Sequence, residues 1–140
     1  MQRLPNNALG KALFKLLNEK LPDVTVYDFV PEEAAVPYVT IGTMVTNDIS
    51  SKAETAYKVT IQINIWSEYR GKYEINKIAE RIMGLLCSMD GYIDVTQDGF
   101  MAYQNTVDMY EAYPEDADGY NGVISLEIRV KDKKLSEQGE

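Results

Sequence analysis

A chain of 140 residues with 45% apolar and 26% charged residues has the size and composition of one globular domain that buries its own core. Its formal net charge of −8 disfavours nonspecific binding to phosphate backbones, which depends on clustered lysine and arginine. The single cysteine, Cys87, excludes an internal disulfide framework, and no apolar run is long enough to span a bilayer. We therefore expect a soluble protein, made in the cytoplasm, with no membrane partner.

The first half of the chain predicts a helix followed by extended segments. Asn6 or Asn7 can cap the helix, and Pro22 ends it. Residues 24–30 form a short extended piece, and residues 38–45 are rich in strand formers. Residues 57–65 alternate between apolar and polar side chains without an error, so one face of this strand is buried and the other is in water. The polar residues 47–52 connect the two strands, which predicts a hairpin with a projecting loop.

The second half predicts another helix and another hairpin. The helix begins between Gly71 and Tyr73 and continues to Met89 on a continuous apolar stripe, and Asp90-Gly91 ends it. A short strand over residues 92–95 follows. Residues 100–113 form a strand of less regular pattern, residues 114–119 have the composition of a turn, and residues 120–130 alternate regularly.

The order helix, hairpin, helix, hairpin predicts an α+β fold. We expect an antiparallel or mixed sheet of four or five strands with both helices on one face, which leaves the other face polar or available to a partner. Residues 1–131 form a single domain, and residues 132–140 form a charged tail that we expect to be flexible. In this tail region Lys131, Lys133 and Lys134 are interpreted as solvated and not as a nucleic-acid site.

Few residues offer catalytic chemistry. The chain has no histidine, which removes the usual general base and the commonest metal ligand. It has no glycine-rich phosphate loop and no local signature of a serine or cysteine nucleophile, so Cys87 is interpreted as a small, half-buried hydrophobic residue. A pair of carboxylates could still act as acid and base. We predict that the protein is not an enzyme and binds no cofactor.

One acidic segment invites a metal interpretation. Asp116, Asp118 and Glu127 have the offsets of the first, third and twelfth positions of an EF-hand calcium loop. Tyr120 stands at the fifth position, however, and Asn121 replaces the required glycine. A hairpin turn with solvated carboxylates fits the segment better, and we predict no metal site.

Tyrosine is unusually abundant, with ten residues, and several of them lie between residues 103 and 120. Tyrosine is favoured at protein–protein interfaces, but aromatic residues also line antiparallel sheets for packing alone, and both interpretations remain open. The candidate interface residues combine the first hairpin loop, this tyrosine group and the acidic turn: Asn47, Asp48, Ser50, Lys52, Tyr103, Tyr110, Tyr113, Asp116 and Asp118.

The chain resembles the small tail-completion proteins of long-tailed bacteriophages and prophages, also called tail terminators or tail-to-head joining proteins. The resemblance spans about residues 8–131, and residues 111–118 and the tail after Lys131 are not hallmarks of that family. The segments that carry it are Val26-Tyr27-Asp28-Phe29-Val30-Pro31, Val36-Pro37-Tyr38-Val39-Thr40-Ile41-Gly42, residues 59–67, Gly71, residues 75–82 and the closing strand, residues 122–130.

The resemblance implies a structural role. Such proteins form a ring, usually hexameric, at the head-proximal end of a finished tail tube, where they stop tube polymerisation and dock to the head connector. The expected partners are therefore other copies of the chain, the major tail tube protein and the head–tail connector protein. DNA would pass through the lumen without specific binding, and the −8 charge suggests that an acidic lumen repels it. The expected location is the virion tail, after assembly in the host cytoplasm.

Two other function classes remain open. A monomeric adaptor or chaperone for tail assembly would use the exposed sheet face to bind one partner chain. A carboxylate-dependent enzyme would use acidic residues such as Asp116 and Asp118.

Overall fold

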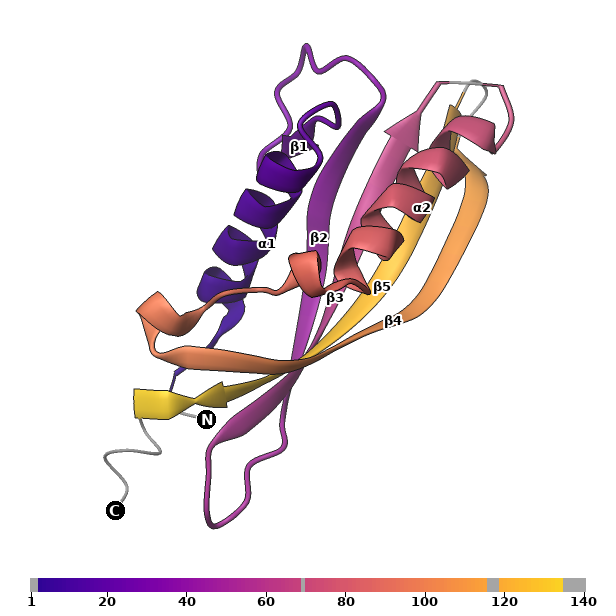
Figure 1. The fold of residues 1–140 in the computed structure, drawn as a ribbon. Helices are drawn as coiled ribbons and strands as arrows, with labels where there is room; N and C mark the ends of the chain where they lie inside the picture. The colour runs from indigo at the N-terminus through magenta and orange to yellow at the C-terminus, as the bar shows by residue number, and fades with distance from the viewer. Residues whose placement is uncertain (1–2, 69, 116–118, 135–140) are drawn as a thin grey trace.

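The computed structural model describes residues 3–68, 70–115 and 119–134. They form two layers: a five-stranded mixed sheet, and two helices that pack on one face of it (Figure 1). The helices are α1 (Asn6–Lys20) and α2 (Tyr73–Leu86). The strands are β1 (Val26–Tyr27), β2 (Tyr38–Asp48), β3 (Ala56–Ser67), β4 (Phe100–Glu115) and β5 (Gly119–Asp132). The predicted α+β class is confirmed.

The strands lie in the order β1-β2-β3-β5-β4. Both predicted hairpins are present, since β2 pairs antiparallel with β3 and β4 pairs antiparallel with β5. Strand β3 also pairs antiparallel with β5, and β1 pairs parallel with Val39 and Thr40 of β2, which makes the sheet mixed. The long strand β4 and the pair β1–β2 therefore form the two edges of the sheet.

The core lies between the sheet and the helices. On β3 and β5 every second side chain is fully buried, as the alternation of residues 57–65 and 120–130 predicts. These side chains meet the apolar stripes of α1 and α2. The fully buried aliphatic residues of the two central strands are Val59, Ile61, Ile63, Ile65, Ile124, Leu126, Ile128 and Val130.

Two strands contain irregularities. In β4 the register shifts between Ala102 and Gln104 and again between Val107 and Met109. Each shift moves the following side chains to the other face, which accounts for the less regular sequence pattern of this strand. A third shift lies in β2 between Ile41 and Met44.

The predicted helix ends need correction. Neither Asn6 nor Asn7 caps α1: Pro5 is the N-cap residue, its carbonyl accepts the Leu9 N–H at 2.9 Å, and the Asn6 side chain instead accepts a hydrogen bond from Thr46. Helix α2 ends at Leu86 and not at Met89.

Cys87 is exposed, so its predicted half-buried state is wrong. After Leu86 the chain folds back against the end of the helix, and at Gly91 a Cβ atom would lie 2.0 Å from the Leu85 carbonyl oxygen. The apolar stripe consequently does not reach Met89, which is 98% exposed.

The predicted strand over residues 92–95 is also absent. Two short 3-10 turns, Met89–Gly91 and Thr96–Asp98, flank this segment, which pairs with no strand among the residues described. Ile93 and Val95 are nevertheless buried while their neighbours are exposed. Burial therefore alternates with a period of two along this segment, but the segment is a linker that places alternate side chains in the core.

The two ends of the described chain are joined by a partly buried ion pair. Asp132, which the sequence assigns to the flexible tail, is the last residue of β5 and is 0% exposed. Its carboxylate accepts two hydrogen bonds from the Arg3 guanidinium, at 2.8 and 3.0 Å. The same guanidinium donates to the carbonyls of Asp98 and Gly99 and lies over the Phe100 ring. Residues 135–140 of the predicted tail lie outside the described residues.

Candidate interaction surface

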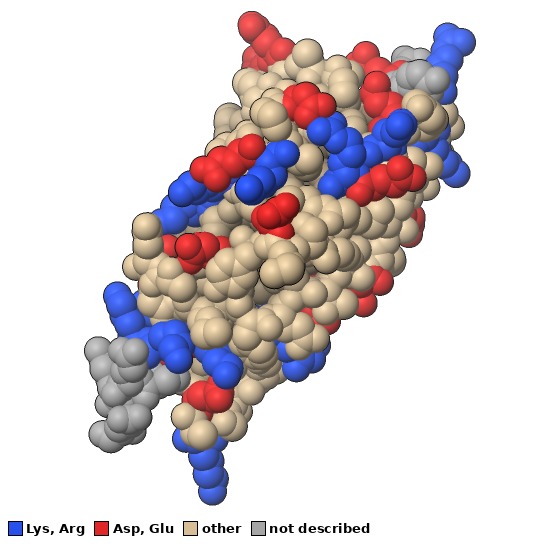
Figure 2. Space-filling view, in the orientation of Figure 1, with Lys and Arg blue, Asp and Glu red and all other residues tan. Residues whose placement is uncertain are grey.

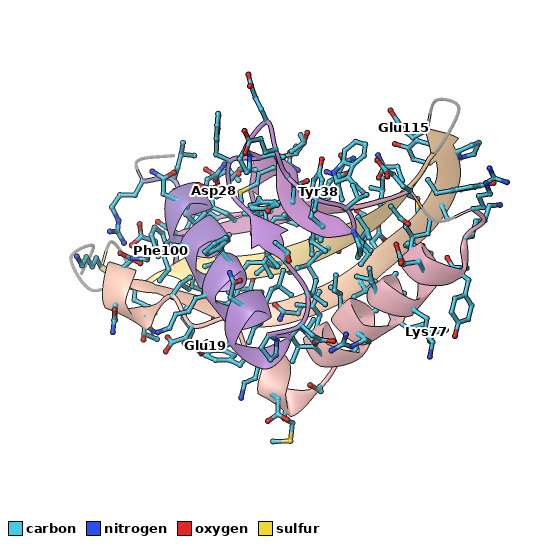
Figure 3. The ribbon with its side chains drawn as sticks, turned by 90° about the horizontal axis from the view of Figure 1, so that it is seen from above. Glu19, Asp28, Tyr38, Lys77, Phe100 and Glu115 are labelled. Atoms are coloured by element: carbon cyan, nitrogen blue, oxygen red, sulfur yellow. The ribbon has the colours of Figure 1, made fainter. Side chains whose placement is uncertain are left out.

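The face of the sheet opposite the helices, called the open face below, has no second layer among the described residues (Figure 3). Its side chains on β3 are polar or amphipathic and partly accessible, in contrast to the aliphatic residues that alternate with them. On β3 these open-face residues are Lys58, Thr60, Gln62, Asn64 and Trp66. None of the helices in the described ranges is both long and apolar enough to cross a membrane.

One end of the open face carries a row of aromatic side chains that crosses the whole sheet. The strand register places Tyr38, Trp66, Asn121 and Tyr113 side by side on β2, β3, β5 and β4. Tyr27 of β1 extends the row, with its ring centroid 5.5 Å from that of Tyr38. The rings of Tyr38 and Trp66 are 6.4 Å apart. We call these five residues the aromatic row.

Asn121 is the only member of the aromatic row that is nearly inaccessible, at 2% exposure. Its side-chain N–H donates to the Tyr113 hydroxyl at 3.1 Å, while its side-chain carbonyl oxygen has no hydrogen-bond partner among the described residues. A buried amide oxygen without a donor is costly in a folded protein. It is therefore a buried acceptor without a described donor, in register with Trp66 and Tyr113.

The opposite end of the open face is cationic. We call Lys58, Arg129 and Lys131 the basic end. All three lie close to carboxylates: Lys58 and Arg129 are 3.9 and 3.8 Å from Glu127, and Lys131 is 3.2 Å from Glu54. The charges at this end are therefore largely balanced within the chain. On the helix-bearing side, acidic and basic side chains are interspersed (Figure 2).

The structure separates the predicted tyrosines. Tyr103 and Tyr113 lie on the open face, and the Lys131 ammonium is 5.0 Å from the centre of the Tyr103 ring. Tyr110 lies on the covered face, where its hydroxyl donates to the Asn76 side chain of α2 at 2.7 Å. Burial raises the pKa of Tyr110. Its visible role is to hold α2 against β4.

The predicted loop residues lie at the tip of the β2–β3 hairpin, which projects beyond the helices (Figure 1). Asn47 and Asp48 belong to β2 itself, so the connection begins two residues later than predicted. The Asp48 carboxylate accepts the Ser50 N–H at 2.8 Å, and hydrogen bonding from Ser50 lowers the pKa of Asp48. Lys52 is exposed. The tip is thus an ordered turn that presents charged groups.

The acidic turn cannot be placed. Asp116 and Asp118 lie outside the described residues, while Glu127 is part of β5, as the sequence predicts. No group of three or more potential metal ligands occurs in the described ranges.

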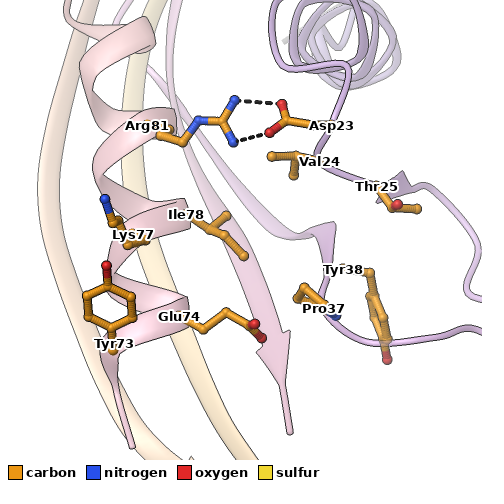
Figure 4. A pocket seen from close by; sticks show the side chains of 10 residues that line it. All are labelled: Asp23, Val24, Thr25, Pro37, Tyr38, Tyr73, Glu74, Lys77, Ile78 and Arg81. Atoms are coloured by element: carbon orange, nitrogen blue, oxygen red, sulfur yellow. Dashed lines mark hydrogen bonds and ion pairs between the residues drawn. The ribbon is translucent and has the colours of Figure 1, made fainter. Parts of the chain in front are cut away.

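A cleft of about 350 Å³ lies on the helix side, between α2 and the segments before β1 and β2 (Figure 4). Arg81 of α2 closes one side of it through two hydrogen bonds to Asp23, both of 2.6 Å. The Arg81 hydrogen bonds, as the largest cause, lower the pKa of Asp23. At the other side Glu74 accepts the Ser67 hydroxyl at 2.6 Å. The pairs link α2 to the sheet layer, so their evident role is structural.

Sequence reasoning missed most of the aromatic row. Of its members only Tyr113 is among the predicted interface residues, although Tyr27, Tyr38 and Trp66 all lie in segments that carry the family resemblance. Their proximity depends on the register between strands, above all the pairing of Trp66 with Asn121. The alternation of residues 57–65 predicts that Trp66 lies on the accessible face, but it does not identify the neighbours of Trp66 on other strands.

Comparison with known proteins identifies a family and a solved structure of similar fold. The family model described as "Tail completion protein gp17" matches residues 8–131. A chain of a solved structure titled "Virion of native gene transfer agent (GTA) particle" is similar in fold, with a TM-score of 0.77 and 21% sequence identity. The similarity covers 90% of this chain and 96% of that chain. A search of curated proteins finds no match. The family match covers nearly all of the domain, and the chain belongs to the tail completion protein gp17 family.

Proposed function

We propose that the protein forms a homo-oligomeric ring, with six subunits expected, on the head-proximal end of a tail tube, where it ends tube polymerisation and docks the tail to the head connector. The family match over residues 8–131 carries the proposal, because membership assigns the chain a structural role in tail assembly. The ring, its position and its partners are what the proposal adds.

The arrangement of sheet edges supports a ring. A ring requires a head-to-tail contact between two different surfaces of each subunit. The sheet ends in two different edges: β4, whose outer side pairs with no described strand, and β2, which β1 covers only at Val39 and Thr40. Strands β2 and β4 run in opposite directions. Rotation about an axis near the strand direction would bring β4 of one subunit antiparallel to β2 of the next.

Native mass spectrometry of the protein, alone and with the tube protein of the same particle, tests the proposal. We expect a ring-sized oligomer, at least in the presence of tube protein. A strictly monomeric species under both conditions contradicts the ring, and a one-to-one complex with a partner supports the adaptor alternative. A second measurement is tube length by electron microscopy: without this protein tubes should exceed their normal length, and with it they should not.

The hairpin tip gives a more local test. The charge reversal Lys52→Glu should reduce ring formation or tube capping while leaving the melting temperature of the isolated subunit nearly unchanged, because this side chain is exposed. The matched control is Lys20→Glu at the end of α1, which should affect neither. An equal loss of melting temperature and of assembly in the tip variant would show that the tip serves folding.

A further inference from the structure

The aromatic row lies next to carboxylates that have no counter-ion among the described residues. Glu111, Tyr113 and Glu115 alternate on β4 without a register shift, so all three point to the open face. Neither glutamate forms an ion pair within the described ranges, whereas the carboxylates beside the basic end do. No lysine or arginine occupies an open-face position in this half of the sheet. These positions are Tyr38, Thr40, Gln62, Asn64, Trp66, Met109, Glu111, Tyr113, Glu115, Gly119, Asn121, Val123 and Ser125.

The groups that lack partners at this end share one requirement. In the part of the chain that the structure describes, Glu111 and Glu115 lack a cation and the Asn121 carbonyl oxygen lacks an N–H donor. The side chains of Tyr38, Trp66 and Tyr113 are partly exposed. A planar cation that carries several N–H groups satisfies all three at once. The guanidinium of arginine stacks on aromatic rings, pairs with carboxylates and donates to amide oxygens, whereas the ammonium of lysine is compact and strongly hydrated.

We propose that the aromatic row, together with Glu111 and Glu115, binds an arginine-bearing segment of another polypeptide. The segment lies across the end of the open face, one guanidinium stacks on Trp66 or Tyr38, and the glutamates of β4 neutralise its charge. Because Asn121 is covered, a donor reaches its carbonyl oxygen when the Tyr113 ring tilts away. That this polypeptide is another component of the particle rests on the proposed function, but the recognition of arginine does not.

Most of the chain's own arginines are not available to this site, which favours a different polypeptide over a second copy of this chain. In the described ranges Asp132 holds Arg3, Asp23 holds Arg81, and Arg129 lies at the opposite end of the open face, which leaves only Arg70, an exposed residue in the segment after β3. In a ring whose axis follows the strands, the basic end of one subunit would lie level with the basic end of the next. It would therefore not meet the carboxylates of the aromatic row.

The single tryptophan makes the proposal directly measurable. Trp66 is the only tryptophan in the chain, so intrinsic tryptophan fluorescence reports on the aromatic row alone. The full-length protein is titrated with a capped tetra-arginine peptide, and capped tetra-lysine and tetra-glutamate serve as comparison peptides. We expect saturable quenching by tetra-arginine with a Kd on the order of 0.1 mM, clearly weaker binding of tetra-lysine, and none of tetra-glutamate.

Two double variants separate the site from net charge. Glu111→Gln with Glu115→Gln should weaken tetra-arginine binding about tenfold, since two charge-assisted contacts are lost. Glu19→Gln with Glu80→Gln changes the net charge equally on the helices and should leave the affinity unchanged. Both pairs are accessible side chains, and a denaturation curve for each variant confirms that it folds.

Four results would overturn the proposal: no quenching, equal weakening in both variants, equal affinity for tetra-lysine, or a shift of Trp66 emission with protein concentration and no peptide. The last would show that a second copy covers the surface. Binding of the peptide does not require that the protein forms a ring. If the protein binds the peptide but stays monomeric with tube protein, the proposed function is wrong and the arginine site stands. If it forms the ring but does not bind the peptide, only the arginine site is wrong.

Discussion

The two faces of the sheet are built from the same strands, yet they differ in chemistry at every position. Along β3 the covered face presents Val59, Ile61, Ile63 and Ile65, all fully buried, whereas the open face presents hydroxyl, amide, ammonium and indole groups. The covered face is closed by two helices of the same chain. The open face has no such layer among the described residues and holds groups whose hydrogen-bonding and charge requirements are unmet.

This contrast separates residues that determine stability from residues available for contact. Burial of aliphatic side chains contributes most of the free energy of folding, and partly accessible polar side chains contribute little. Substitutions on the covered face should therefore reduce the free energy of unfolding, while substitutions on the open face should alter binding.

The largest difference in stability is expected between substitutions at two adjacent residues of β3. Ile63→Ala should reduce the free energy of unfolding by about 2 to 5 kcal/mol, because it removes a fully buried side chain and leaves a cavity. Gln62→Ala, on the open face, should change it by less than about 0.5 kcal/mol. Denaturation in urea, followed by circular dichroism, measures both. Similar losses for the two variants would mean that the open face is also a folding surface.

The ion pair between the chain ends should have the next largest effect. Asp132→Asn leaves the Arg3 guanidinium without its carboxylate and should reduce the free energy of unfolding by roughly 2 to 3 kcal/mol. A double-mutant cycle with Arg3→Gln isolates the pairwise term. Because Asp132 is 0% exposed, we expect a coupling energy of at least about 1 kcal/mol. Coupling near zero would show that the two ends fold independently.

Tyr110 tests whether a tyrosine of β4 that lies on the covered face contributes to stability. Tyr110→Phe should reduce the free energy of unfolding by roughly 1 kcal/mol at neutral pH, since it removes the hydrogen bond to Asn76. Burial raises the pKa of Tyr110 above its ordinary value of 10.0, so the folded state favours the neutral phenol. The corresponding stability is present below pH 10.0 and is lost as pH rises through the folded pKa.

The measurement is unfolding at several pH values up to the alkaline range, for the wild type and for Tyr110→Phe. The wild-type advantage should shrink as the pH rises. Tyr103→Phe is the matched control on the open face, and it should show a smaller loss of stability. An advantage that is independent of pH would contradict the burial of the Tyr110 ring.

The same contrast explains which features the sequence could predict. Residues 57–65 and 120–130 alternate without interruption, and a period of two determines both the strand and its buried face, so these strands and their core residues were predicted correctly. Residues 92–95 alternate equally well but form no strand. Alternation reports alternate burial, and it does not require a neighbouring strand to supply hydrogen bonds.

The interaction surface was harder to predict, because it depends on contacts between distant segments. The faces of Tyr110 and Tyr113 could have been distinguished, since they are three positions apart in one strand and point to opposite sides. The assembly of Trp66, Asn121 and Tyr113 could not, because it follows from the register of three strands. Likewise, the pairing of Arg3 with Asp132 joins two charged residues that each look like part of a solvated terminus.

The smallest effect is expected from the exposed pair of Asp23 and Arg81. The Arg81 hydrogen bonds lower the pKa of Asp23 below its ordinary value of 3.8, so the pair stabilises the folded state above pH 3.8 and loses this contribution as pH falls through the folded pKa. Arg81→Met should therefore destabilise the protein slightly at neutral pH and not at pH 2, and high salt should reduce the difference. The readout is the difference in melting temperature between wild type and variant across this range. A difference that persists at pH 2 would mean that the Arg81 side chain acts through its packing over the cleft and not through its charge.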